Sequence, residues 1–239
     1  MEPNTKSKGK IIVIEGSDGT GKETQTHLLI ENIQKLGHSV TSIAFPRYSS
    51  GTLGGKLLHL TIKSEHASEY KLSTINPYSA SLLYVMDRVE STSYIKELLD
   101  TYDFVIMDRY YTANLLHQGA KFDNEIERNR FLDTMYTIEV EQLHIPKADI
   151  VIYLTLPFAV SLARMERRHK ELGIAIDQTE KDHEYIKNST ERGLDIAKHL
   201  GWSVIEGVEL DASGNIIKEY SKEERQEHVL QTLKDSHII

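Results

Sequence analysis

A glycine-rich segment near the start of the chain constrains the fold more than any other stretch. Residues Ile11–Gln25 read IIVIEGSDGTGKETQ, which is an apolar run, a loop with three glycines and a polar segment. Glycines permit tight turns in which successive backbone N–H groups point toward one anion. The helix that follows adds the positive end of its dipole, and Lys22 adds a full charge. The pattern therefore predicts a strand, a phosphate-binding loop and a helix, and hence a site for the phosphates of a nucleoside triphosphate.

The residue after the loop lysine departs from the usual pattern. That residue is normally Ser or Thr, whose hydroxyl binds Mg²⁺. Here Glu23 follows Lys22, and Thr24 comes next. We therefore expect the metal to use Thr24, a carboxylate, or another group such as Asp108. The residues expected to bind the ATP donor are Gly16, Ser17, Asp18, Gly19, Thr20, Gly21, Lys22, Glu23 and Thr24.

Size and composition limit the remaining possibilities. The chain has 239 residues, of which 39% are hydrophobic, so we expect one domain spanning residues 1–239. Cysteine is absent, which excludes disulfides, thiolate zinc sites and a cysteine nucleophile. The formal net charge of −8 disfavours nucleic acid as a partner. There is no apolar run of ~20 residues to span a membrane and no apolar core of a signal peptide, so we expect a cytoplasmic protein.

Apolar runs alternate with helical patterns, which indicates an α/β fold with a parallel sheet. The runs VIM and IVIYL lack polar alternation, as expected for strands covered on both faces. The predicted strands are Lys10–Glu15, Val40–Phe45, Phe104–Met107, Ile150–Leu154 and Ser203–Ile205. The predicted helices are Gly21–Leu36, Leu53–Ile62, Pro77–Asp100, Glu125–Leu143, Phe158–Lys170, Lys181–Leu200 and Lys222–Lys234. Asp211–Asn215 reads as a turn between the last strand and the last helix.

Polar clusters follow the first three predicted strands, where ligands of such sheets bind. After the glycine-rich loop come FPRYSS and then MDRYY. In the latter, Asp108 can help to hold Mg²⁺ and Arg109 can bind a phosphate with its two-pronged guanidinium. An ordinary ion pair between Asp108 and Arg109 is the alternative.

Two further clusters lie on predicted helices. Tyr84 and Arg88 are four residues apart, so they share a helix face that could hold a base by stacking and edge hydrogen bonds. The alternative is a helix surface on which Arg88 pairs with Asp87 or a nearby acid. Arg164, Arg167 and Arg168 project together, just before the irregular polar segment GIAIDQTEKD. We expect a mobile lid at about residues 165–182 that closes over the polyphosphate, and the alternative is a solvated basic face.

These pieces together resemble the thymidylate kinase family, which transfers the γ-phosphate of ATP to dTMP. The resemblance covers about residues 10–205 and rests on EGSDGTGKETQ, FPRYSSGTLGGKLL, NPYSASLLYVMDR, DRYYTANLLHQGAK, IYLTLPFAVSLARM and DQTEKDHEYI. It implies a P-loop kinase fold: a five-stranded parallel sheet with helices on both faces and a lid. It also implies ATP and Mg²⁺ as cofactors and dTMP as the acceptor.

The resemblance assigns roles to individual residues. Asp18 would face the 3′-hydroxyl region of the deoxyribose, and Arg47 and Arg109 would bind the acceptor phosphate. Tyr84 would stack on the pyrimidine and Arg88 would bind its edge. The residues expected to bind the acceptor are Asp18, Phe45, Arg47, Tyr84, Arg88, Arg109, Asn114 and Gln118. Those expected to act in catalysis are Lys22, Asp108, Arg109, Arg164 and Arg168, with Asp108 and Thr24 at the metal.

Two features bear on the activity and its alternatives. One class of the family carries its charge-stabilising arginine in the phosphate loop, where this chain has Gly19. The resemblance therefore implies that an arginine of the lid stabilises the transferred charge, with Arg164, Arg167 and Arg168 as candidates. The lid of the family often carries Asp-Arg, where this chain has Asp177-Gln178. The alternatives are a kinase for another pyrimidine nucleotide or for a deoxynucleoside, with Glu15 as its base, and a weakly catalytic nucleotide-binding module. The family is often dimeric, so we expect a homodimer that packs through the helix Pro77–Asp100.

Overall fold

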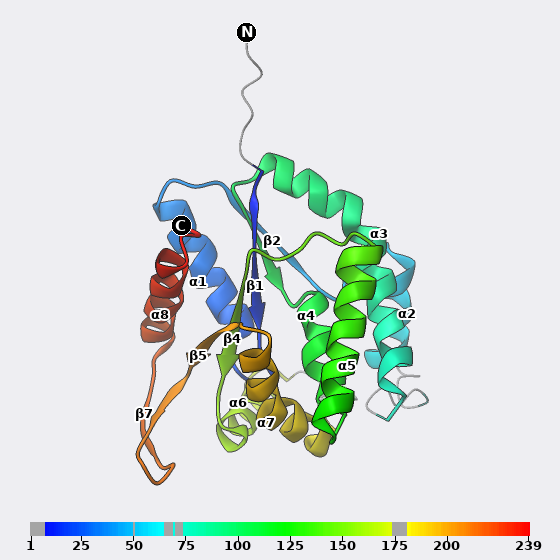
Figure 1. The fold of residues 1–239 in the computed structure, drawn as a ribbon. Coiled ribbons are helices and arrows are strands. Elements are labelled where there is room, and N and C mark those ends of the chain that lie inside the picture. The colour runs from blue at the N-terminus through cyan, green and yellow to red at the C-terminus, as the bar shows by residue number, and fades with distance from the viewer. Residues whose placement is uncertain (1–7, 50, 65–68, 70–73, 174–180) are drawn as a thin grey trace.

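The computed structural model describes residues 8–49, 51–64, 69, 74–173 and 181–239. Its centre is a parallel sheet of five strands in the order β2-β3-β1-β4-β5 (Figure 1). The strands are β1 (Lys10–Glu15), β2 (Val40–Ala44), β3 (Phe104–Asp108), β4 (Ile150–Thr155) and β5 (Ser203–Glu206). Both neighbours of β1 pair with it in parallel register, with Ile12 opposite Ile106 on β3 and opposite Ile150 on β4. The predicted α/β class and five-stranded parallel sheet are confirmed.

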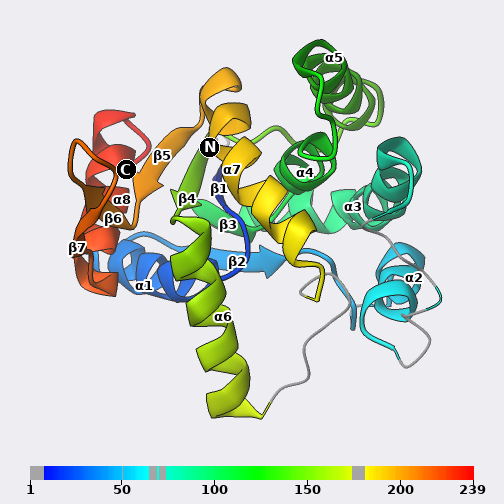
Figure 2. The ribbon, with the colours of Figure 1, turned by 90° about the horizontal axis from the view of Figure 1, so that it is seen from below.

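Alternate residues of β1 point into two separate cores, because successive side chains of a strand face opposite sides. Ile11 and Val13 belong to the larger core, and Ile12 and Ile14 belong to the other. Helices α1 and α8 cover the second core, while α3 and α4 lie on the opposite face of the sheet (Figure 2). Burial on both faces explains why these strands lack polar alternation.

The observed helices follow the predicted ones closely. They are α1 (Lys22–Lys35), α2 (Leu53–Ile62), α3 (Pro77–Thr101), α4 (Tyr111–Ala113), α5 (Glu125–Tyr136), α6 (Phe158–Leu172), α7 (His183–His199) and α8 (Lys222–Asp235). Two π-helical segments, η2 (Asn114–Gln118) and η3 (Thr137–Gln142), continue α4 and α5. Local signals set the starts: Asn76 caps α3 ahead of Pro77, and Ser221 and Glu224 form a capping box at α8.

A β-hairpin between β5 and α8 was not predicted. Strands β6 (Val208–Leu210) and β7 (Ile216–Glu219) pair antiparallel around the turn that was predicted at Asp211–Asn215. All four residues of β7 are exposed, so the strand has no buried face and no apolar alternation to identify it. The hairpin projects away from the sheet (Figure 1).

Only part of the predicted lid falls within the described residues. Residues 165–172 belong to α6, and α7 begins at His183 after its capping residue Asp182. Residues 174–180, including Asp177 and Gln178, lie outside the described residues. None of the helices in the described ranges is long and apolar enough to cross a membrane.

Candidate active site

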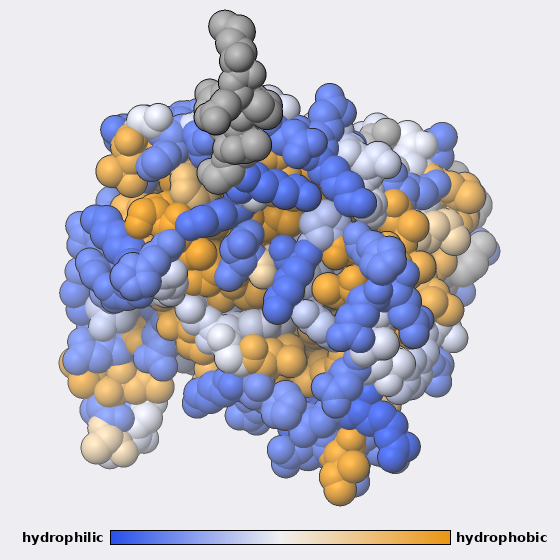
Figure 3. Space-filling view, turned by 45° about the horizontal axis from the view of Figure 1, so that its top comes forward, coloured by the Kyte–Doolittle hydropathy of each residue, from blue (hydrophilic) through white to orange (hydrophobic). Residues whose placement is uncertain are grey.

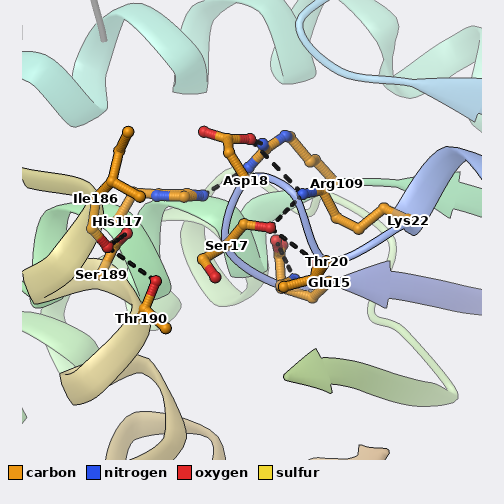
Figure 4. A network of polar contacts seen from close by, with 11 residues as sticks. Glu15, Ser17, Asp18, Thr20, Lys22, Arg109, His117, Ile186, Ser189 and Thr190 are labelled. Carbon is orange, nitrogen blue, oxygen red and sulfur yellow. Dashed lines mark hydrogen bonds and ion pairs between the residues drawn. The ribbon is translucent and has the colours of Figure 1, made fainter. Parts of the chain in front are cut away.

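The phosphate loop joins β1 to α1 and is fixed by bonds within itself. Lys22 Nζ donates to the Ser17 carbonyl at 2.9 Å, and Thr20 Oγ1 donates to the same oxygen at 2.8 Å (Figure 4). Gly16, Gly19 and Gly21 have φ angles of 151°, 79° and 89°, which L-residues rarely adopt. The predicted loop therefore has the conformation for which its glycines are required.

Gly19 shows why the loop carries no arginine at that position. A Cβ built there would lie 2.3 Å from the Ser161 carbonyl oxygen and 2.9 Å from Met165 Cγ. Helix α6 thus packs directly on the loop and leaves no room for a side chain. Any catalytic arginine must come from another element.

One cavity lies over the phosphate loop and brings together the residues predicted for donor, metal and lid. It encloses about 1050 Å³ not filled by protein atoms. Its walls are Asp18, Gly19, Gly21, Lys22, Glu23, Thr24, Asp108, Arg109, Arg164, Met165, Arg167 and Arg168. Lys22, Thr24 and Asp108 thus meet the three arginines of α6 as expected, and we call this space the donor cavity.

A second cavity of about 650 Å³ opens beside the first. It is lined by Asp18, Phe45, Pro46, Tyr48, Ile62, Tyr84, Asp87, Arg88, Arg109, Tyr110, Ala113, Asn114, His117, Gln118 and Tyr185. We call it the acceptor cavity. It holds every predicted acceptor residue except Arg47, and Asp18 and Arg109 line both cavities.

Arg47 is not among the described residues that line the acceptor cavity, although Pro46 and Tyr48 on either side of it are. Its Nη1 donates to Ser91 Oγ at 3.0 Å, and its guanidinium lies 4.8 Å from the centre of the Tyr94 ring. Its backbone N–H donates to Asp87 Oδ2 at 2.7 Å. Arg47 therefore contacts α3 through both its backbone and its guanidinium, which the sequence spacing did not reveal.

Asp18 and Arg109 form an ion pair where the two cavities meet (Figure 4). Burial would raise the pKa of Asp18, but the charges of Arg109 and Lys22 outweigh it and hold that pKa below its ordinary value. Burial would lower the pKa of Arg109, but Asp18 and Glu15 raise it above its ordinary value. Both groups therefore stay charged at neutral pH.

The backbone also sets the position of Arg109. It has a φ of 62°, in the left-handed region that a non-glycine residue enters at a cost of about 1–2 kcal/mol. Such conformations concentrate at functional sites, where the surrounding structure enforces them. The Arg109 N–H donates to the Ile14 carbonyl at 3.2 Å, which secures the turn that directs the side chain off β3.

His117 is a site residue that the sequence did not indicate. Its Nε2 lies 2.5 Å from Arg109 Nη1, and its ring stacks on Tyr185 with centroids 6.1 Å apart. Burial and the charge of Arg109 lower the pKa of His117 to about 3. The imidazole is therefore neutral near pH 7 and can accept a hydrogen bond from Arg109.

Glu139 is a second residue that the sequence did not indicate. It lies on η3 and accepts from Arg88 Nε at 2.6 Å and from Arg88 Nη2 at 2.9 Å. Its Oε1 also accepts from Asn114 Nδ2 at 2.8 Å. The Arg88 and Glu139 side chains are each 1% exposed. Arg88 therefore has an acidic partner, but the pair is buried instead of lying on a helix surface, and the acid is 51 residues away in the sequence. Arg88 also lines the acceptor cavity.

Glu15 would be the catalytic base if the chain were a deoxynucleoside kinase. It is fully buried at the end of β1. It accepts from Thr112 Oγ1 at 2.8 Å and from the Gly16 N–H at 3.0 Å. Burial raises the pKa of Glu15 against the lowering effect of Arg109 and Lys22. The described linings of the donor and acceptor cavities do not include it, so it is poorly placed to take a proton from a hydroxyl.

The lid arginines project from α6 as predicted. Arg164 forms an ion pair with Glu219 of the hairpin, and Arg167 lies 3.9 Å from Glu171. Arg168 lines the donor cavity and contributes to lowering the pKa of Asp18. The acids that Arg164 and Arg167 contact are partly exposed, so both pairs can exchange for a phosphate at little cost.

The parallel sheet, the phosphate loop and the two adjoining cavities define a P-loop nucleotide kinase. A family model described as thymidylate kinase matches residues 14–223. The chain belongs to the thymidylate kinase family.

Individual relatives agree with this assignment. The thymidylate kinase of Mycobacterium tuberculosis is 27% identical over 205 residues, which cover 84% of this chain and 92% of that protein. The human thymidylate kinase is 32% identical over 157 residues, which cover 66% of each chain. The solved thymidylate kinase of Candida albicans superposes with a TM-score of 0.69 over 98% of this chain and 95% of its own. Its sequence identity is 21%, so it supports the fold alone.

Proposed function

We propose that this chain transfers the γ-phosphate of ATP to dTMP, which gives ADP and dTDP. The observation that carries the proposal is the junction of the two cavities at Asp18 and Arg109. A donor on the phosphate loop and an acceptor in the second cavity would present their phosphates to each other there. Such a reaction needs alignment and charge stabilisation more than covalent participation by the protein.

The donor cavity supplies the positive charge. Lys22 would bind the β- and γ-phosphates together with the loop amides, and Arg164 and Arg168 would stabilise the transferred charge. Arg109 would reach the acceptor phosphate from the shared wall. Its contacts with Asp18 and His117 hold the guanidinium before the substrate arrives.

The donor cavity also fits Mg²⁺. Asp108 and Thr24 are oxygen donors on its wall, and Mg²⁺ binds one or two protein oxygens together with substrate phosphates. Bound there, the ion would neutralise charge on the phosphates. Glu23 lines the same cavity and is exposed, so this carboxylate is also available to the metal.

The acceptor cavity suits a nucleoside monophosphate. Tyr84 would stack on the pyrimidine, and Phe45, Asn114 and Gln118 would complete its surroundings. Glu139 binds Nε and Nη2 of Arg88, so Nη1 is the nitrogen available for the edge of the base. Asp18 would meet the 3′-hydroxyl region of the sugar.

The first test is ADP release coupled to a visible reaction, with ATP, Mg²⁺ and dTMP. We expect activity in the wild-type chain and a loss of several orders of magnitude in Lys22→Ala, which should still fold. Lys35→Ala, at the exposed far end of α1, is the matched control and should behave as the wild type. Absence of dTMP-dependent ADP release in the wild type would refute the proposal.

The acceptor itself needs a competition assay. The structure of the Candida albicans enzyme is reported to reveal the origin of broad substrate specificity in that protein. The assay should therefore compare dTMP, dUMP, UMP and thymidine. A preference for UMP or thymidine would support the alternative kinases. Tight ATP binding without transfer to any acceptor would support the weakly catalytic module.

We further propose a homodimer that packs through α3. Leu82, Met86 and Val89 lie on one face of this helix and are 56%, 37% and 37% exposed. Figure 3 shows hydrophobic residues on the side of the molecule where α2 and α3 lie, amid a mostly hydrophilic surface. Light scattering should give twice the mass of 27.3 kDa, and Met86→Asp should give the monomer. A monomeric wild type would refute this.

We also propose a cytoplasmic location, because ATP is available to the enzyme in that compartment.

A further inference from the structure

Helix α8 places a buried arginine behind the phosphate loop. Arg225 is 2% exposed, and its Nη1 donates to the Thr20 carbonyl at 2.6 Å. The residue lies 205 positions from its partner in the sequence. The match to the family model ends at residue 223, two residues before Arg225.

The surroundings of Arg225 are built to contain its guanidinium. A Cβ at Gly207, the residue after β5, would lie 2.5 Å from Leu156 Cδ2 and 3.1 Å from Arg225 Cζ, so this glycine leaves room for both side chains. Gln25 Nε2 donates to the Lys222 carbonyl at 2.9 Å, which ties the first turn of α1 to the first turn of α8. Figures 1 and 2 both show α8 lying beside α1. The arginine is therefore held by two elements that border the loop.

Burial of this side chain is costly, and packing alone does not account for it. In the part of the chain that the structure describes, Arg225 Nε and Nη2 have no hydrogen-bond partner. Burial and the nearby charge of Arg164 lower the pKa of Arg225 to about 10, so the group remains charged at neutral pH. A charged hydrogen bond to the Thr20 carbonyl is the specific gain of this arrangement.

The geometry of the loop shows what that bond accomplishes. A phosphate-binding loop needs its N–H groups directed inward, so its carbonyls point outward and need partners of their own. Ser17 O has Lys22 and Thr20 as donors from within the loop. Thr20 O, next to Gly21 and Lys22, has Arg225 from outside it.

We propose that Arg225 is a positioning residue for the donor nucleotide, holding the Thr20 carbonyl outward so that the loop stays open to phosphate. This inference rests on the proposed use of ATP at the loop. It concerns the donor alone, because Arg225 lies outside the lining of the acceptor cavity among the described residues. The charge behind the loop also favours the bound polyphosphate.

The test compares Arg225→Met, Arg225→Gln and Arg225→Lys by calorimetric titration with MgATP and by steady-state kinetics. Loss of a charged hydrogen bond predicts a weakening of MgATP binding by about tenfold to a hundredfold in the two neutral variants. The KM for ATP should rise likewise, while the KM for dTMP should stay within twofold, on the order of experimental error. Arg225→Lys should recover part of the affinity.

Val229→Ala separates positioning from simple support of the helix. Val229 is fully buried on α8, one turn beyond Arg225, and lies in the second core. Its truncation should lower the melting temperature and leave the affinity for MgATP unchanged. The exposed Lys234 on the same helix, changed to Met, controls for charge and should alter neither.

Three outcomes of these measurements would overturn the role proposed for Arg225. Wild-type affinity for MgATP in either neutral variant overturns the proposal, as does an equal loss of affinity in Val229→Ala. Failure of both neutral variants to fold also overturns it, because the guanidinium would then serve folding. A wild-type chain that does not bind MgATP refutes the proposed function itself, a result that the wild-type titration gives separately.

Discussion

The buried pair of Arg88 and Glu139 gives the sharpest prediction about stability. Glu139→Gln keeps the shape of the side chain and removes its charge, so the effect reports on charge with little cavity formation. Both side chains are 1% exposed, and Glu139 accepts three hydrogen bonds, two from Arg88 and one from Asn114. The substitution leaves the Arg88 cation buried without a counter-charge.

The expected magnitude follows from this burial. Removing one partner of a buried ion pair costs about 3–5 kcal/mol. For a chain of 239 residues, each kcal/mol lowers the melting temperature by about 2–4 °C, so we expect a fall of roughly 6–20 °C. Urea unfolding followed by circular dichroism measures the free energy directly, with an unchanged denaturant slope.

Two further variants make the experiment decisive. Glu141→Gln changes an exposed glutamate on the same π-helical segment and should cost less than about 0.5 kcal/mol. The double variant Arg88→Met, Glu139→Leu replaces the pair by apolar side chains and should recover most of the stability. It should not recover the KM for dTMP, because Arg88 lines the acceptor cavity. A cost for Glu139→Gln no larger than that for Glu141→Gln would refute the reasoning.

Three further predictions concern the loop, the neutral histidine and the lid. Gly19→Ala should lower the melting temperature and the affinity for MgATP more than Gly37→Ala does. Both glycines have φ near 80–90°, but a Cβ at Gly19 would lie 2.3 Å from the Ser161 carbonyl oxygen, whereas a Cβ at Gly37 would meet nothing within 4 Å. Equal melting temperatures would contradict this prediction. In the wild type, the free energy of unfolding should fall as the pH drops from about 6.5 toward 3, because the unfolded chain binds a proton at His117 that the folded chain does not. His117→Phe should make this fall smaller. His117 can contribute at most about 1.4 kcal/mol per pH unit to this fall. If the change in unfolding free energy between pH 7 and pH 5 is the same in His117→Phe as in the wild type, the histidine is not held neutral. Glu219→Gln should change the unfolding free energy by less than about 1 kcal/mol, because its pair with Arg164 is half exposed; chemical denaturation checks it.

The sequence by itself determined the sheet and the phosphate loop. Short-range signals were sufficient there: apolar runs for buried strands, Asn76-Pro77 for the start of α3, and glycines with Lys22 for the loop. It also indicated one active site, because the polar groups after β1, β2 and β3 must meet at one edge of a parallel sheet. The placement of Asp18, Lys22, Asp108 and Arg109 followed from that edge alone.

Only the tertiary structure decided which partners those residues have. Glu139 reaches Arg88 across 51 positions, and Arg225 reaches Thr20 across 205, so no local pattern could pair them. The contacts of Arg47 with Ser91 and Tyr94 on α3 likewise join residues far apart in the sequence, and its role at the acceptor phosphate stays a prediction. The hairpin β6–β7 was not predicted, because all residues of β7 are exposed and the strand has no buried face. Periodicity reports burial along one element, whereas charge pairing depends on which elements fold against each other.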